Sequence, residues 1–190
     1  MRSVITAYLE KASDAVEGLR EITADIEHAA EILKKSLDSG GRVLVLGCGG
    51  SAADAQHFAT ELQCRFRKDR SPLPALALTT NTSLLTAVSN DYDFSHVFSR
   101  QVRALAADDD AVVLISTSGN SDPVLKAAAA AGEVGAKTVG LTGSSGGLLK
   151  DLCDVMVAVP SDITSHIQEA HITVIHIICL LLENSFFPDE

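Results

Sequence analysis

The sequence has little positive charge. Only 15 Lys and Arg stand against 25 Asp and Glu in 190 residues, so the net charge is −10. A surface that binds nucleic acid needs clustered basic side chains. Only residues 65–70 are locally basic, and we expect this short stretch to be a solvated helix end or an anion-facing edge. The composition therefore argues against nucleic acid as a partner.

Cysteines are few, and long apolar runs are lacking. The four cysteines are scattered with no C-x-x-C spacing, and no secretory signal precedes them, which predicts reduced thiols in a cytoplasmic protein. The longest apolar stretch, residues 174–182, is interrupted by His176 and is far shorter than the ~20 residues that cross a bilayer. We therefore expect no membrane partner.

Strand-like and helix-like segments alternate after an amphipathic N-terminal region. Residues 3–38 are predicted to form one or two helices that end at Gly40 and Gly41. Strands are predicted at 43–46, 76–78, 111–115, 138–141 and 155–159, and helices at 52–66, 83–88, 94–106, 124–131, 148–150 and 163–184. Parallel strands need crossover connections, so this alternation predicts an α/β fold with a parallel sheet of about five strands. Ligands in such sheets bind beyond the carboxyl ends of the strands.

The length and the two ends of the chain predict its organisation. We expect one domain over residues 1–190, with an N-terminal helical segment at 1–40 and a sheet-and-helix core at 41–190. The last helix is apolar almost all round from 172 to 182, and the N-terminal helices also carry an apolar stripe. We therefore expect a homo-oligomer in which these helices pack between subunits.

A loop rich in hydroxyl groups follows the strand predicted at 111–115. It offers Ser116, Thr117, Ser118 and Ser121, and Gly119 leaves backbone N–H groups accessible. Pro123 suits the first turn of the helix that follows. Because helix N-termini carry unsatisfied N–H groups and partial positive charge, the loop can hold a phosphate. The alternative is an ordinary turn with good capping residues.

A glycine-rich loop follows the first predicted strand. It reads Gly47-Cys48-Gly49-Gly50-Ser51 and allows backbone N–H groups to approach an oxygen-rich ligand. It lacks the third glycine of a dinucleotide fingerprint and the Gly-Lys-Ser/Thr of a nucleoside triphosphate loop. The alternative is a tight turn with Ser51 as the helix cap.

Two parts of the sequence carry side chains suited to metal binding or proton transfer. His57 and Glu61 are four residues apart, hence on one helix face, and could hold a divalent metal or act as an acid–base pair. His176 lies among isoleucines, two turns after Gln168, and needs a partner if buried. The alternatives are a surface contact for the first pair and a core histidine bonded to a carbonyl. Ser118 lacks the G-x-S-x-G elbow of a nucleophilic serine.

Four segments together resemble one family. Residues 46–61, 73–91, 116–121 and 167–176 resemble the phosphoheptose isomerases, which are sugar isomerase (SIS) domain proteins, and the likeness covers nearly the whole chain in order. The resemblance implies a three-layer parallel α/β sandwich, a homotetramer and one Zn²⁺ per subunit. It also implies an enzyme that converts sedoheptulose 7-phosphate to D-glycero-D-manno-heptose 7-phosphate through an enediol, the first step toward nucleotide-activated heptose for lipopolysaccharide.

The resemblance also assigns site residues. It implies Glu61 and His176 as catalytic residues. The implied zinc ligands are His57, Glu61, Gln168 and His176. The implied substrate-binding residues are Cys48, Gly49, Gly50, Ser51, Asn90, Asp91, Ser116, Thr117, Ser118, Ser121 and Gln168.

The sequence departs from the family pattern at two positions. Cys48 stands where the family usually has asparagine, and a thiol is only a weak hydrogen-bond donor. It could serve as a substrate contact, a zinc ligand, a redox-sensitive thiol or a small turn residue. Asn81 stands where aspartate is common.

Two other functions fit the same family resemblance. One is a non-catalytic relative that binds the replication initiator; it lacks the acidic residue and the histidine that this chain has at Glu61 and His176. The other is an SIS-domain isomerase or sensor for another phosphosugar, a group that generally works without metal.

Overall fold

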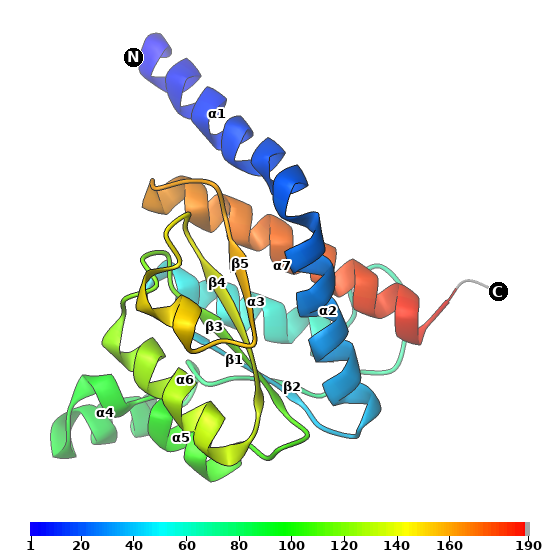
Figure 1. Cartoon of the computed structure of the whole chain (residues 1–190), viewed down its shortest axis with the longest axis vertical. Helices are drawn as coiled ribbons and strands as arrows, with labels where there is room; N and C mark the ends of the chain where they lie inside the picture. Colours follow the sequence, from blue (N-terminus) through cyan, green and yellow to red (C-terminus); the bar gives the residue numbers. More distant parts are fainter. Residues whose placement is uncertain (189–190) are drawn as a thin grey trace.

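Short apolar segments form a parallel sheet at the centre of the structure (Figure 1). The computed structural model describes residues 1–188. Within them the strands are β1 (Val43–Gly47), β2 (Ala75–Ala77), β3 (Ala111–Ile115), β4 (Lys137–Thr142) and β5 (Val155–Ala158). Their order across the sheet is β2-β1-β3-β4-β5, and every neighbouring pair is parallel. Strands β1 and β3 are buried throughout, which explains their uninterrupted apolar sequences.

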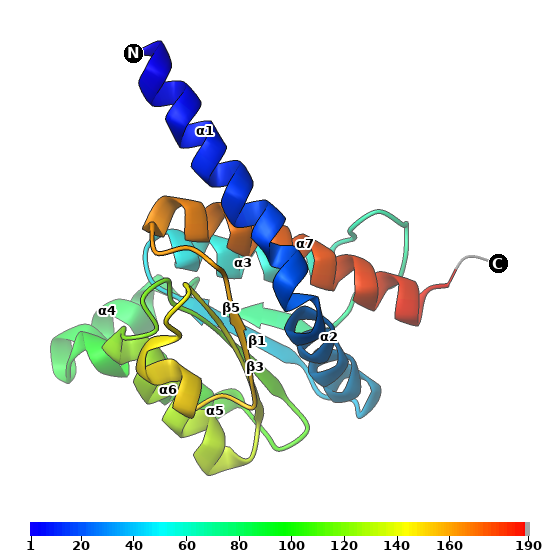
Figure 2. The same ribbon diagram turned by 45° about the horizontal axis from the view of Figure 1, so that its top comes forward.

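Helices cover both faces of the sheet and complete three layers (Figures 1 and 2). One face carries α2 (Thr23–Asp38), α3 (Gly50–Gln63) and α7 (Thr164–Phe186), and the other carries α4 (Thr82–Asp91), α5 (Ser99–Leu105) and α6 (Asp122–Val134). Alternate side chains of β1 enter the two cores, Val43 and Val45 on one side and Leu44 and Leu46 on the other. The predicted three-layer α/β class is confirmed.

The N-terminal region consists of two helices joined by a 3₁₀ turn. Helix α1 (Arg2–Glu17) leads through η1 (Gly18–Ile22) into α2. In both views α1 projects past the sheet and its covering helices (Figures 1 and 2). Ala15 is the residue of α1 that is buried. The apolar stripe expected on this helix is therefore largely open in the single chain.

Two predicted helices differ from the observed ones. The helix predicted at 94–106 is divided into η2 (Phe94–His96) and α5, because Val97 and Phe98 turn into the core between them. The helix predicted at 52–66 begins at Gly50 and ends at Gln63. It ends there because the Arg70 guanidinium donates hydrogen bonds to the carbonyl oxygens of Glu61 and Leu62 in its last turn. The expectation of a solvated basic stretch is wrong for Arg70, whose side chain is 2% exposed. The remaining 3₁₀ element is η3 (Gly147–Asp151).

Helix α7 is the one described helix that is long and apolar enough to cross a membrane. Half of its most apolar window is buried inside the structure. Val174, Ile175 and Ile178 belong to the core beneath α2 and α3. Its apolar character is that of a core helix, as the sequence predicts.

His171 on α7 ties stability to pH. Its side chain is fully buried, and its Nε2 pairs with the carbonyl oxygen of Thr142. Burial lowers the pKa of His171 from 6.5 to about 4, and the hydrogen bond to Thr142 raises it by a smaller amount. Between pH 6.5 and 4 the unfolded chain therefore binds more protons at this histidine than the folded chain does. The free energy of unfolding accordingly falls as the pH drops through this range. We expect the wild type to lose about 2 kcal/mol more than His171→Gln between pH 7.5 and 5. Urea unfolding at both pH values measures this; equal losses would contradict it.

Candidate active site

Two loops meet because their strands are neighbours. Strands β1 and β3 pair in register from Val43 opposite Ala111 to Gly47 opposite Ile115. The glycine-rich loop and the hydroxyl-rich loop therefore leave the same edge of the sheet. Ser121 Oγ lies 3.7 Å from Cys48 Sγ, within hydrogen-bond range for sulfur. The two loops expected to bind substrate thus lie side by side.

The glycine-rich loop brings a residue of α7 to the start of α3. Gly49 has φ +61° and is the N-cap of α3, a conformation that favours glycine. A Cβ on Gly50 would lie 2.3 Å from Nε2 of Gln168, so a side chain at this position would displace the Gln168 amide. Ser51 is not the expected cap; it lies buried in the first turn of α3. Gln168 therefore lies directly against the glycine-rich loop.

The hydroxyl-rich loop presents its side chains unequally. Ser116 is buried, Thr117 and Ser121 are half-buried, and Ser118 is exposed. Gly119 has φ +65°, and a Cβ there would lie 2.1 Å from a backbone oxygen of the neighbouring loop before η3. Glycine is therefore required at the tip of this loop.

Two backbone N–H groups of this loop are already used. Gly119 N–H donates to the carbonyl oxygen of Ser116, and Asn120 N–H donates to Ser118 Oγ. The expectation that Gly119 leaves N–H groups accessible is thus wrong at these two positions, because the loop closes on itself as a turn. The loop still presents hydroxyl groups at the N-terminus of α6, and Ser121 is the N-cap of that helix.

Three side chains from two helices converge at one point between α3 and α7. His57 and Glu61 come from α3 and His176 comes from α7. His57 Nε2 lies 3.0 Å from Glu61 Oε1 and 3.3 Å from His176 Nε2. One donor atom from each residue lies within 4.8 Å of the other two. We call His57, Glu61 and His176 the triad. His176 is accordingly no core histidine bonded to a carbonyl.

The triad has the chemistry and spacing of a metal site. Tetrahedral zinc with bonds of about 2.0–2.1 Å separates its ligand atoms by about 3.3 Å. Two of the contacts in the triad match that spacing. Two imidazole nitrogens and a carboxylate are also the ligand set of many catalytic zinc sites, which leave a position open for substrate. The residues therefore fit a metal ion.

The other residues implied by the family stand at different distances from the triad. Gln168 precedes His176 by eight residues, about 12 Å along α7. Asn90 and Asp91 end α4, are exposed, and bond to each other through Nδ2 and Oδ1 at 2.8 Å. Within residues 1–188 no hydrogen bond joins this pair to the triad or to the two loops.

Two groups near the site have raised pKa values. Burial raises the pKa of the Cys48 thiol, against a smaller opposite effect of the Ser121 hydroxyl. Cys48 is therefore a neutral thiol at pH 7, and it lies outside the metal-ligand cluster of residues 1–188. Burial also raises the pKa of Asp54, which the nearby His57 lowers in part. Asp54 Oδ2 is buried without a hydrogen-bond partner in the described chain.

Sequence reasoning missed three residues beside the triad. The Phe66 ring stacks on the His176 ring with centroids 5.7 Å apart. Arg70 and Glu183 form a buried ion pair at 3.0 Å behind it. The one sequence signal for this ion pair is the position of Glu183, a charged residue that follows Leu180–Leu182 in an otherwise apolar helix.

Comparison with known proteins gives a consistent result. Residues 7–143 match the SIS domain family. A phosphoheptose isomerase of Geobacter sulfurreducens is 52% identical over 97% of this chain and 98% of its own length. Solved phosphoheptose isomerases of Neisseria gonorrhoeae and Francisella tularensis are 42% and 39% identical, with TM-scores of 0.89 and 0.92. These two matches cover 95% and 96% of this chain, and 98% and 97% of the solved chains.

Proposed function

Because this chain belongs to the phosphoheptose isomerase family of SIS domain proteins, we propose that it is an aldose–ketose isomerase. Its reaction is the conversion of sedoheptulose 7-phosphate to D-glycero-D-manno-heptose 7-phosphate through an enediol. The observation that carries this proposal is the triad, in which two imidazoles and a carboxylate from α3 and α7 bring their donor atoms within 4.8 Å of one another.

The reaction moves a proton between two neighbouring carbons of the sugar. It needs a base for the carbon-bound proton and a group that moves protons at the oxygens. Glu61 takes the first role and His176 the second. Their metal-ligand atoms lie within 4.8 Å of each other, and with an ion bound through those atoms the second Glu61 oxygen and His176 Nδ1 would remain to exchange protons.

We assign one Zn²⁺ per subunit to the triad, with Gln168 as a further ligand. The ion supplies Lewis-acid polarisation of a substrate oxygen. The chain contributes His57 and His176 as neutral nitrogen ligands and Glu61 as an oxygen ligand. Gln168 lies against Gly50, about 12 Å along α7 from His176, so its amide would have to leave this position to join the ion.

We assign the phosphate to the hydroxyl-rich loop through Ser116, Thr117, Ser118 and Ser121. The N-terminus of α6 adds partial positive charge there. The remaining proposed substrate contacts are Cys48, Gly49, Gly50, Ser51, Asn90, Asp91 and Gln168. Cys48 contributes at most a weak S–H bond, since its thiol is neutral.

The proposed setting is a cytoplasmic one, in a single domain spanning residues 1–190. The product would enter the synthesis of nucleotide-activated heptose for lipopolysaccharide. All four cysteines are free, as reduced thiols require.

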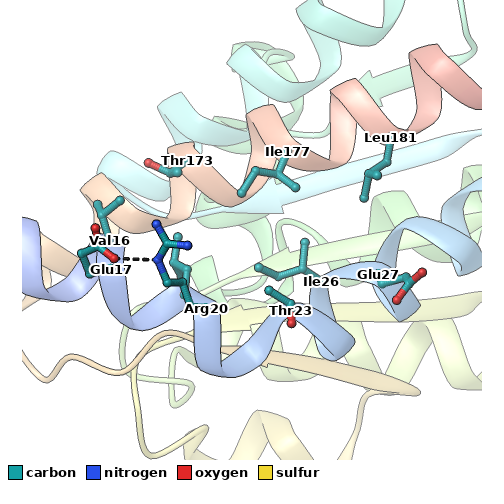
Figure 3. A pocket seen from close by; sticks show the side chains of 10 residues that line it. Val16, Glu17, Arg20, Thr23, Ile26, Glu27, Thr173, Ile177 and Leu181 are labelled. Atoms are coloured by element: carbon teal, nitrogen blue, oxygen red, sulfur yellow. Dashed lines mark hydrogen bonds and ion pairs between the residues drawn. The ribbon is translucent and has the colours of Figure 1, made fainter.

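We further propose a homotetramer, because the chain leaves an apolar surface open on its N-terminal helices. Val4, Ile5 and Leu9 of α1 are 59–71% exposed. The surface continues into a pocket of about 410 Å³ between η1–α2 and α7, where Ile26, Ile177 and Leu181 point toward one another (Figure 3). Monomers rarely leave such patches uncovered. A second copy of the chain that presents the same helices would cover both the exposed side chains of α1 and this pocket.

Charging α1 tests this assembly. The double variant Ile5→Glu, Leu9→Glu is expected to convert tetramers to smaller species in light scattering, because buried carboxylates without partners oppose association. Leu152→Glu changes an exposed leucine near η3 and should leave the tetramer intact. A double variant with the wild-type mass would exclude α1 from the interface.

A direct assay tests the proposed reaction. Purified protein with Zn²⁺ should convert sedoheptulose 7-phosphate to the aldose, detected by NMR or by coupled phosphorylation of the product. The comparisons do not favour the two alternatives, initiator binding and another phosphosugar. Failure to convert the heptose, together with capture of the replication initiator or turnover of another sugar phosphate, would replace the proposal.

A further inference from the structure

A buried carboxylate lies two turns beyond His176 on the same helix. Glu183 follows His176 by seven residues, so the two side chains share one face of α7. Glu183 is fully buried. The chain that follows α3 runs beside this part of α7 (Figures 1 and 2).

The carboxylate fixes the loop after α3 through its backbone. Glu183 Oε1 accepts from the N–H of Phe66 at 3.3 Å. Oε2 accepts from the N–H groups of Arg67 at 2.9 Å and Lys68 at 3.2 Å. Burial alone would raise the pKa of Glu183, but these bonds and the one from Arg70 hold it below its usual value. The group is therefore a carboxylate at neutral pH.

The partner of this carboxylate holds the end of α3. Arg70 Nε donates to Glu183 Oε1 at 3.0 Å. The same guanidinium donates to the carbonyl oxygens of Leu62 and Glu61, each at 2.9 Å. Arg70 therefore links the backbone of a triad residue on α3 to the helix that carries another.

The loop in turn contacts the triad. Phe66 stacks on the ring of His176 at an interplanar angle of 29°, and His176 meets the ring of His57 edge-on, with centroids 5.1 Å apart. The His176 imidazole is thus in contact with both the Phe66 ring and the His57 ring. Rotation of the His176 ring out of this arrangement would break its contacts with both rings.

We infer that Glu183, Arg70 and Phe66 are positioning residues that hold the His176 imidazole toward His57 and Glu61 before any ligand binds. This inference deepens the proposed function, since the oriented ring is the one assigned to the metal and to proton transfer. Glu183 and Arg70 act on the loop, and Phe66 transmits their effect to the ring.

The test uses the full chain and two readouts. Crystal structures of the metal-free variants Phe66→Leu and Glu183→Gln report the orientation of the His176 ring, and competition with a chelator reports the affinity for Zn²⁺. We expect the ring to turn away in both variants and the affinity to fall about 10- to 100-fold, as for other residues that orient metal ligands. Phe66→Tyr keeps the ring and should restore both.

The matched control is Asp110→Asn. Asp110 is also a buried carboxylate that accepts backbone N–H bonds, from Arg42 and Ala107, but its described bonds go to the segments before β1 and β3, and not to α7 or the triad. Its variant should bind Zn²⁺ as tightly as the wild type, within about twofold. If Glu183→Gln does not fold, Phe66→Leu alone tests the orientation of the His176 ring.

The inference and the proposed metal site fail on different results. An unmoved His176 ring in Phe66→Leu overturns the inference, whatever the wild type binds. A wild type that binds no Zn²⁺ overturns the proposed metal site, while the ring orientation still decides the inference.

Discussion

Glu61→Gln is expected to lower kcat for heptose phosphate isomerisation by at least about 10²-fold. General acid–base catalysis contributes typically 10²–10⁴-fold, and a carboxamide cannot take up the carbon-bound proton. The carboxylate contacts His57 at 3.0 Å and is partly exposed, so an isosteric amide leaves the fold intact. Steady-state kinetics with sedoheptulose 7-phosphate measures the loss, and circular dichroism checks the fold.

Glu133→Gln is the matched control for this loss. Glu133 lies on α6 and pairs with Arg103 on the surface, far from the triad in sequence and on the opposite face of the sheet. Its variant should keep wild-type kcat. A Glu61→Gln enzyme with near-normal turnover would remove Glu61 from the role of base.

His57→Ala is expected to abolish tight Zn²⁺ binding. Loss of a ligand should weaken affinity by more than the 10- to 100-fold typical of residues around the ligands. Bound metal stabilises a folded protein by an amount that grows with the logarithm of its affinity, so a chelator should lower the Tm of the wild type and leave that of His57→Ala unchanged. Metal analysis should find about one zinc per chain in the purified wild type and close to none in His57→Ala.

His28→Ala controls for the removal of an imidazole. His28 is exposed on α2 and does not belong to the triad. Its zinc content and its response to chelator should match the wild type. Full zinc content in His57→Ala would place the ion elsewhere.

Periodicity and spacing predicted much of this structure. Uninterrupted Val, Leu and Ile runs identified the buried parallel strands, since both faces of such a sheet are covered. The spacing of His57 and Glu61 placed them on one helix face. Their approach to His176, 115 residues beyond Glu61, followed only from the resemblance to a family, because no local pattern reports contacts between distant segments.

What the sequence could not predict depended on tertiary contacts. The end of α3 at Gln63 is set by Arg70, and a helix-forming pattern through residue 66 gives no sign of that guanidinium. The close approach of Gly50 to the Gln168 amide joins segments that are distant in sequence. The buried pair of Arg70 and Glu183 looked like two ordinary charges.

A crystal structure of the protein with Zn²⁺ and sedoheptulose 7-phosphate, with anomalous scattering recorded at the zinc edge, tests the central claim most directly. We expect an anomalous peak between His57, Glu61 and His176, the phosphate against Ser116–Ser121, and the first two sugar carbons beside Glu61. An ion bound away from these three side chains, or a phosphate bound far from the hydroxyl-rich loop, would contradict it.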